Sequence, residues 1–194
     1  DPVMGPPDKG CIVAPGVADF LKHRALACAD MLAPNLLELE QLTGRDIRNV
    51  PEAIEACQQL RAQGVKLVMV KHLGKAGFAM DRFEMLLVCE EGTFHLSRPL
   101  YPFARHPIGV GDLLSATMLA NLLAGCTPVA AFELTNASVD AVLARAATGR
   151  CPARDGAAAG LHPGDPPLSC LYQQQKQQSP DHQGFLYFRF GERA

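Results

Sequence analysis

The sequence has no apolar run that approaches the roughly 20 residues needed to span a bilayer. Its first residues, Asp1 to Gly5, lack the charged and apolar regions of a secretory signal peptide. Neither sign of charge dominates, because the formal net charge is -2 and both signs are interspersed, so no basic face is available for a nucleic-acid backbone. These absences predict a cytoplasmic protein with neither a membrane nor a nucleic acid as partner.

Motifs of several common active sites are missing as well. The sequence contains no G-x-x-x-x-G-K-[ST] phosphate loop and no G-x-G-x-x-G dinucleotide fingerprint. The seven cysteines form no C-x-x-C pair, which is typical of reduced thiols in the cytosol. The six histidines include no H-E-x-x-H motif, so a zinc site is not expected.

Helical and strand-like patterns alternate between Pro15 and Arg145, which indicates an α/β domain with a largely parallel sheet. The apolar runs at 31–33 and 67–70 predict strands that are buried on both faces. The segments 84–88 and 93–96 flank a short turn, and this arrangement predicts a hairpin.

Three helices are expected in the same region. Asn49 with Glu52 three residues later predicts a helix from about residue 50 to 63. Residues 113–124 are apolar nearly all round, which predicts a buried helix. Thr127 followed by a proline predicts the start of another helix that reaches about residue 145.

The composition changes after Gly149, where proline, glycine and glutamine dominate without periodicity. We expect residues 1–149 to form the ATP-binding and catalytic portion of the domain, and residues 150–194 to be an atypical tail, disordered or frame-shifted. The apolar stretch at 185–190 is the part of this tail that is able to pair as a strand.

The clearest indication of chemistry is Gly109-Val110-Gly111-Asp112 at the start of the predicted helix. Two glycines allow the backbone to approach a ligand closely, and the free N–H groups at a helix start favour an anion. Asp112 is then placed to accept a proton from a hydroxyl that attacks a phosphoryl group. A turn followed by a helix cap is the alternative interpretation.

A second pattern, Asn35-Leu36-Leu37-Glu38, follows the predicted strand at 31–33. Asn35 and Glu38 lie about one helical turn apart on one face. At the carboxyl end of a strand they could orient a hydrated Mg²⁺ on nucleotide phosphates. A helix cap with a solvated glutamate is again the alternative.

These two motifs, in this order and separation, occur with the runs Val70-Lys71-His72-Leu73 and Asp81-Arg82-Phe83-Glu84-Met85. Together they resemble the bacterial pyridoxal kinases of the ribokinase superfamily, over about residues 1–147. The resemblance implies a ribokinase-like α/β fold and transfer of the γ-phosphate of ATP to the 5′-hydroxymethyl group of pyridoxal. It also implies Mg²⁺ on the phosphates and a homodimeric parent protein.

The resemblance further implies roles for single residues. Asp112 is expected to be the base that contacts the pyridoxal hydroxymethyl group, with Gly109 and Gly111 beside it, and Asn35 and Glu38 to belong to the magnesium motif. The expected ATP site consists of Asp1, Ala33, Glu38, Lys71, Arg98, Pro99, Leu100 and Tyr101.

The chain also departs from the family pattern. Family members begin with a long further segment that supplies the first strands and most contacts to the pyridine ring, and Tyr101 replaces a smaller aliphatic residue. We therefore expect an incomplete half-domain without pyridoxal kinase activity of its own. A hydroxymethylpyrimidine kinase, which shares the motifs, and an inactive nucleotide-binding remnant stay open as alternatives.

Overall fold

The computed structural model describes residues 1–6, 9–79, 81–103 and 107–148, together with the backbone of 186–190. The chain divides into two compact units, a sheet unit of residues 1–100 and 184–194 and a helical unit of residues 101–183. The expected α/β class is confirmed by the sheet and helices of these units. The expected boundary at 149 and 150 lies outside the described residues and stays a prediction.

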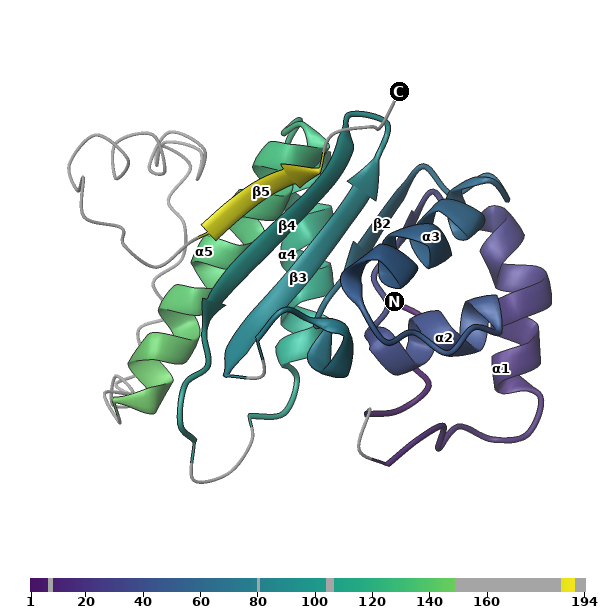
Figure 1. Cartoon of the computed structure of the whole chain (residues 1–194), viewed down its shortest axis with the longest axis horizontal. Coiled ribbons are helices and arrows are strands. Elements are labelled where there is room, and N and C mark those ends of the chain that lie inside the picture. Colours follow the sequence, from purple (N-terminus) through teal and green to yellow (C-terminus); the bar gives the residue numbers. More distant parts are fainter. Residues whose placement is uncertain (7–8, 80, 104–106, 149–185, 191–194) are drawn as a thin grey trace. The chain divides into compact units, whose positions relative to one another are not determined.

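The sheet unit contains strands in the spatial order β1-β2-β3-β4-β5 (Figure 1). In the described residues β1 pairs with β2 in parallel, and the other three neighbouring pairs are antiparallel. The sheet is therefore mixed rather than largely parallel, because the tight turn after β3 can only join antiparallel strands. The strands are β1 (Met31–Leu32), β2 (Leu67–Val70), β3 (Arg82–Cys89), β4 (Gly92–Pro99) and β5 (Leu186–Phe190).

The predicted hairpin is confirmed as β3 and β4, which are longer than the sequence indicated. Cys89 pairs with Gly92, so Glu90 and Glu91 form the turn between them. Gly92 has a φ of 130°, a conformation that glycine adopts without strain.

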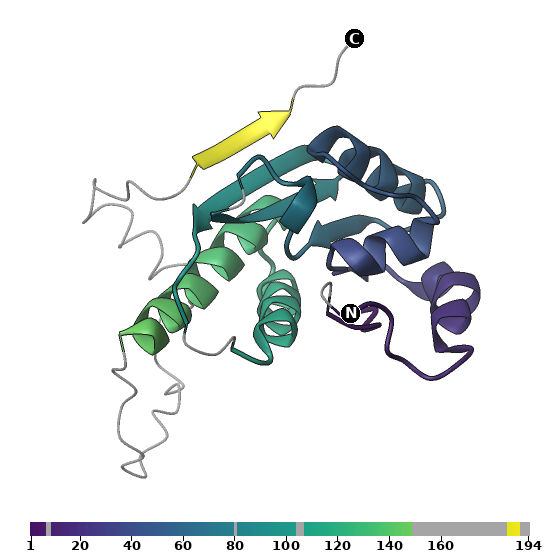
Figure 2. The same cartoon turned by 60° about the horizontal axis from the view of Figure 1, so that its bottom comes forward.

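The helical segments of the sheet unit pack on one side of the sheet. Val68, Val70 and Leu86 lie in a single core cluster with buried residues of two helices, such as Leu39 and Leu60. Figure 2 shows these helices beside the strands. The segments are α1 (Val17–Phe20), η1 (Leu21–Ala25), η2 (Leu26–Cys28), α2 (Leu36–Thr43), α3 (Val50–Arg61) and η3 (Gly74–Ala76).

The predicted helix at 50–63 is confirmed as α3, and it begins as its sequence indicated. The Asn49 side chain accepts a hydrogen bond from the Glu52 N–H at 2.9 Å, which satisfies a donor at the helix start. The helix ends at Arg61, two residues early, and turns occupy the residues that follow.

The strand predicted near the end of the chain is confirmed as β5. Its residues pair antiparallel with β4, from Thr93 with Phe190 to Ser97 with Leu186. The rest of the expected tail, 150–185 and 191–194, lies outside the described residues.

The helical unit contains α4 (Val110–Leu123) and α5 (Pro128–Ala147), which pack against each other. Their contact includes a hydrogen bond at 3.3 Å from the Asn121 amide to the Thr135 hydroxyl. The prediction that α4 is buried was wrong, because Leu119 and Leu123 are 50% and 80% exposed. A helix that is apolar all round needs partners on every side, and α5 covers only one.

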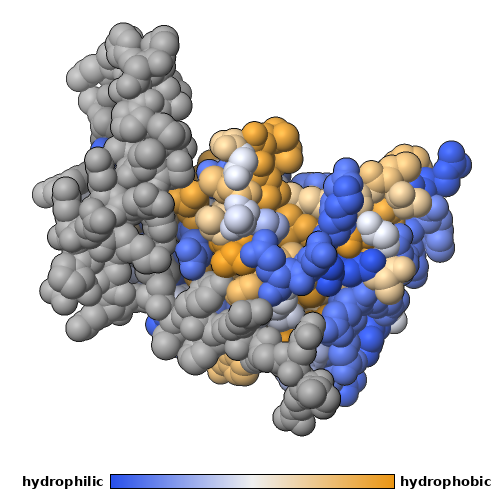
Figure 3. Space-filling model, turned by 90° about the horizontal axis from the view of Figure 1, so that it is seen from above, coloured by the Kyte–Doolittle hydropathy of each residue, from blue (hydrophilic) through white to orange (hydrophobic). Residues whose placement is uncertain are grey.

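Apolar and hydrophilic residues are interspersed on the face drawn in Figure 3. Among the described residues, no helix is long and apolar enough to cross a membrane.

His95 makes the stability of this fold sensitive to acid. It is 1% exposed in β4, and burial, with a smaller contribution from the charge of Arg82, lowers its pKa from 6.5 to about 4. The Nε2 atom of His95 lies 3.6 Å from a carboxylate oxygen of Glu84. Between these two pKa values His95 binds more protons in the unfolded chain than in the folded chain. Its contribution to the free energy of unfolding is therefore fully present above about pH 6.5 and is lost as the pH decreases toward about 4.

We expect wild-type protein to lose about 2 kcal/mol of unfolding free energy through His95 between about pH 7 and about pH 5. His95→Gln should remove this loss, because glutamine does not titrate. Urea unfolding at the two pH values measures it, with His23→Gln, at an exposed histidine, as the control. The same acid-induced loss in wild type and His95→Gln would contradict the assignment.

Candidate functional site

Three strands end at one edge of the sheet. β1 and β2 are parallel, and just beyond them the Lys71 N–H donates to the Pro34 carbonyl at 2.9 Å, one residue after β2 and two residues after β1. β4 runs in the same direction as β2, because both are antiparallel to β3, and it ends at Arg98 and Pro99. In α/β sheets the carboxyl ends of strands are where ligands bind, so this edge is the candidate site.

Asn35 and Glu38 form a capping box at the start of α2. Asn35 Oδ1 accepts the Glu38 N–H at 2.9 Å, and Glu38 Oε2 accepts the Asn35 N–H at 2.7 Å. The Asn35 amide also donates to the Gly5 carbonyl at 3.0 Å. This box therefore fixes both the helix start and the neighbouring residues near the beginning of the chain.

Glu38 also belongs to a buried ion cluster with Asp1 and Lys71. The Lys71 ammonium lies 2.6 and 2.7 Å from the two oxygens of Asp1 and 3.8 Å from Glu38 Oε2. The Lys71 and Glu38 side chains are 8% and 2% exposed, and that of Asp1 is 15% exposed. Glu38 Oε1 accepts the Met4 N–H at 3.2 Å.

The ion cluster holds the ammonium group of Lys71 at the candidate edge of the sheet. Burying an ion pair contributes little to stability, since desolvation offsets most of the attraction. The two carboxylates instead restrict Lys71 to one position. Such a fixed donor is suited to binding an anion such as a phosphate.

Arg98 places a second cation at the same edge. It is 1% exposed, and its guanidinium carbon lies 4.0 Å from the centroid of the Phe83 ring, a cation–π contact. The His72 ring stacks on Phe83 with centroids 4.6 Å apart. Burial lowers the pKa of His72, so the neutral form is favoured there.

The other residues of the expected ATP site differ in exposure. Ala33 is 1% exposed, while Pro99 and Leu100 are exposed at the end of β4. Tyr101 begins the helical unit, where its hydroxyl donates to Asp140 Oδ1 at 3.0 Å. This bond ties the segment before α4 to α5.

Asp112 lies within the first turn of α4 rather than before the helix. Gly109 is the N-cap, with a φ of 86°, and α4 begins at Val110, three residues earlier than predicted. Asp112 is exposed and Gly111 is half-buried. The Asp112 carboxylate is thus near the positive end of the helix dipole, which favours negative charge.

The structure thus brings the residues expected on nucleotide phosphates together within the sheet unit, namely Asp1, Asn35, Glu38 and Lys71. Gly109, Gly111 and Asp112 form a second group in the helical unit. Sequence reasoning missed the backbone groups of Met4, Gly5 and Pro34, because a main-chain contact leaves no signal in residue identity.

The oxygens of Asn35 and Glu38 are not arranged as direct ligands of a metal ion. Each already accepts a backbone N–H, as described above. In the part of the chain that the structure describes, no group of three or more His, Cys, Asp and Glu side chains is suited to hold a metal. A role of Asn35 and Glu38 on Mg²⁺ stays a prediction, and the N–H groups that their oxygens already accept favour one through water.

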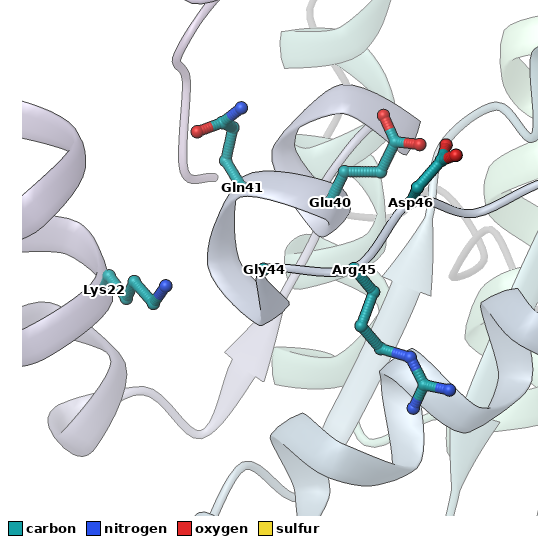
Figure 4. A pocket seen from close by; sticks show the side chains of 6 residues that line it. All are labelled: Lys22, Glu40, Gln41, Gly44, Arg45 and Asp46. Carbon is teal, nitrogen blue, oxygen red and sulfur yellow. The ribbon is translucent and has the colours of Figure 1, made fainter.

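A surface hollow of about 410 Å³ lies elsewhere on the sheet unit (Figure 4). Three of its charged side chains have partners, since Arg45 pairs with Glu55, and Lys75 lies 2.9 Å from Glu40 and 3.3 Å from Asp46. A ligand there would have to compete with these pairs. The hollow is lined by Lys22, Glu40, Gln41, Gly44, Arg45 and Asp46.

The family model described as phosphomethylpyrimidine kinase matches residues 1–151. The chain belongs to this family. The pyridoxal kinase PdxY of Aliivibrio fischeri is 60% identical to this chain over 145 residues, which are 74% of this chain and 50% of that protein. The resemblance to bacterial pyridoxal kinases is therefore confirmed, and the chain spans about half the length of this relative.

Solved structures agree with this family assignment. The pyridoxal kinase of Entamoeba histolytica has a TM-score of 0.68 and 20% identity, over 98% of this chain and 61% of its own, which shows the shared fold. The pyridoxal kinase of Staphylococcus aureus in complex with ADP has a TM-score of 0.61 and 26% identity, over 72% of this chain and 50% of its own.

The pattern Asn-x-x-Glu occurs twice in this chain, at Asn35 and at Asn49, which allows a matched test of the ion cluster. Glu38→Gln puts an amide donor against a backbone N–H and removes a charge beside Lys71. We expect it to lower the free energy of unfolding by about 2 kcal/mol, because buried groups lose their partners. Glu52→Gln, in the exposed cap of α3, should cost about 0.5 kcal/mol.

Urea unfolding of the two variants and the wild type measures both values. Equal losses for Glu38→Gln and Glu52→Gln would show that Glu38 is only a helix cap.

Proposed function

We propose that this chain provides the ATP-binding and proton-accepting part of a pyridoxal kinase, which transfers the γ-phosphate of ATP to the 5′-hydroxymethyl group of pyridoxal. The observation that carries the proposal is the Lys71 ammonium, held by Asp1 and Glu38 at the carboxyl edge of the sheet. Its support from the comparisons is the 60% identity to a pyridoxal kinase.

In this proposal Lys71 donates to phosphate oxygens of ATP, and Asp1 and Glu38 keep its ammonium in place before the nucleotide binds. Phosphoryl transfer depends mainly on positioning and on stabilising the charge that spreads over the transferred group. A preoriented ammonium serves both needs, since it requires no rearrangement during the reaction. Ala33, Arg98, Pro99, Leu100 and Tyr101 are proposed to line the nucleotide near it.

Asp112 is proposed as the base. Its carboxylate takes the proton from the 5′-hydroxyl as that oxygen bonds to the γ-phosphorus, and the bond from phosphorus to the bridging oxygen of ADP breaks. Gly109 and Gly111 carry no side chains, so the backbone N–H groups at these positions can contact the transferred phosphoryl group.

Mg²⁺ is proposed to accompany ATP and to neutralise part of the phosphate charge. Asn35 and Glu38 would hold its water ligands rather than the ion itself. The homodimer and the cytoplasmic location expected from the sequence stay predictions.

A hydroxymethylpyrimidine kinase is the second candidate, because the matching family model carries the name of a phosphomethylpyrimidine kinase. The 60% identity to a pyridoxal kinase favours pyridoxal as the acceptor.

Nucleotide binding tests the role of Lys71. We expect Lys71→Met to weaken the binding of ADP to the chain about tenfold or more, because a charge-assisted contact with phosphate is lost. Lys75→Met is the control, since Lys75 is half-exposed and paired with Glu40 and Asp46. Isothermal titration calorimetry measures both, and equal affinities in the two variants would remove Lys71 from the site.

The role of Asp112 is tested in a chimaera in which the N-terminal half of the Aliivibrio fischeri relative precedes residue 1. Asp112→Ala should lower kcat about 100-fold or more, because general base catalysis is lost, while the KM for ATP changes little. Glu133→Gln, a carboxylate on α5, is the control. A coupled assay with pyridoxal measures turnover, and near wild-type kcat in Asp112→Ala would exclude this base.

A further inference from the structure

The connection from β2 to β3 is attached to the first residues of β3. The Leu73 N–H donates to the Glu84 carbonyl at 2.9 Å. The Phe78 N–H donates to the Glu84 carboxylate at 2.6 Å. Glu84 therefore holds the connection at two points, with its main chain and with its side chain.

Glu84 is 3% exposed, so its carboxylate has exchanged water for contacts within the protein. Burying a carboxylate is costly unless hydrogen bonds compensate it. An apolar residue in this strand would avoid that cost, and yet the position holds a glutamate that caps a loop amide. This geometry indicates that the loop conformation is what the carboxylate maintains.

Gly77 fits the same contact. A Cβ atom at this position would lie 1.8 Å from Glu84 Oε2, so an alanine there would force the carboxylate and the loop apart. The φ of Gly77 is -72°, so the backbone alone does not require glycine. The close approach of the carboxylate does, because the Phe78 N–H must reach it.

This attachment is close to the ion cluster along the chain. Lys71 precedes Leu73 by two residues, and the ring of the residue between them, His72, stacks on Phe83, the neighbour of Glu84. The first residues of β3 thus hold the segment that follows Lys71 in two ways, by the ring stack at His72 and by the backbone hydrogen bond at Leu73.

We propose that Glu84 is a positioning residue for the nucleotide site, which acts by anchoring residues 72–79 and thereby the segment that presents Lys71. The inference rests on the proposed function, since it assumes that Lys71 meets the phosphates. Glu84 itself does not touch the nucleotide in this proposal.

The test compares variants that differ in the hydrogen-bond acceptor. Glu84→Ala removes it, and Gly77→Ala displaces the loop from it, whereas Glu84→Gln keeps an oxygen that accepts the Phe78 N–H. Glu90→Ala, in the exposed turn of the hairpin, is the control. ADP affinity is measured by calorimetry, amide exchange of residues 72–79 by mass spectrometry, and Tm by calorimetry.

Glu84→Ala and Gly77→Ala should weaken ADP binding by about fivefold or more and accelerate exchange in 72–79 by about tenfold, because a buried charge-assisted hydrogen bond is lost. Glu84→Gln and Glu90→Ala should stay within about twofold of the wild type in affinity.

Two results overturn the inference. One is a Glu84→Ala variant with a lowered Tm but ADP affinity within about twofold of the wild type, since the residue is then merely structural. The other is a Glu84→Gln variant that binds ADP as weakly as Glu84→Ala does, because the acceptor oxygen for the Phe78 N–H would then not matter. If the wild-type chain does not bind ADP at all, the proposed function fails instead, and the dependence of nucleotide binding on Glu84 fails with it.

Discussion

The arrangement of the sheet unit depends on how one buried ammonium group is neutralised. Lys71 leaves β2 with its side chain directed at Asp1 and Glu38, residues far from it in the sequence. Because a buried charge without a partner is strongly unfavourable, the residues near the beginning of the chain, the start of α2 and the end of β2 must stay together. The same restriction gives Lys71 a single orientation.

Hydrogen bonds to the backbone make this arrangement specific. Glu38 accepts the N–H groups of Met4 and Asn35, and the Asn35 amide donates to Gly5. Glu84 does the same for the connection that follows Lys71. In both places a buried carboxylate binds main-chain donors, so its position defines the path of a loop as well as the charge balance.

The two Asn-x-x-Glu patterns show where sequence reasoning stops. Asn49 was expected to begin a helix, and for Asn35 a helix cap was the alternative interpretation. Both residues do cap a helix, since N-capping depends on residues three apart in the chain. The metal hypothesis and the capping alternative for Asn35 and Glu38 could not be separated from the pattern alone. Burial separates the two pairs, because Glu38 lies in the ion cluster and the contacts of Glu52 are exposed.

Local interactions, acting over a few residues, determined what the sequence by itself predicted about this protein. The features predicted in this way are the caps at Asn49 and Thr127, the hairpin with its short turn and the glycine-rich start of α4. Only the tertiary structure decided that Asp1, Glu38 and Lys71 share one cluster, that Glu84 anchors a loop and that β4 is the partner of β5. Such contacts join residues distant in the chain, and their formation depends on burial and charge compensation that no local pattern encodes.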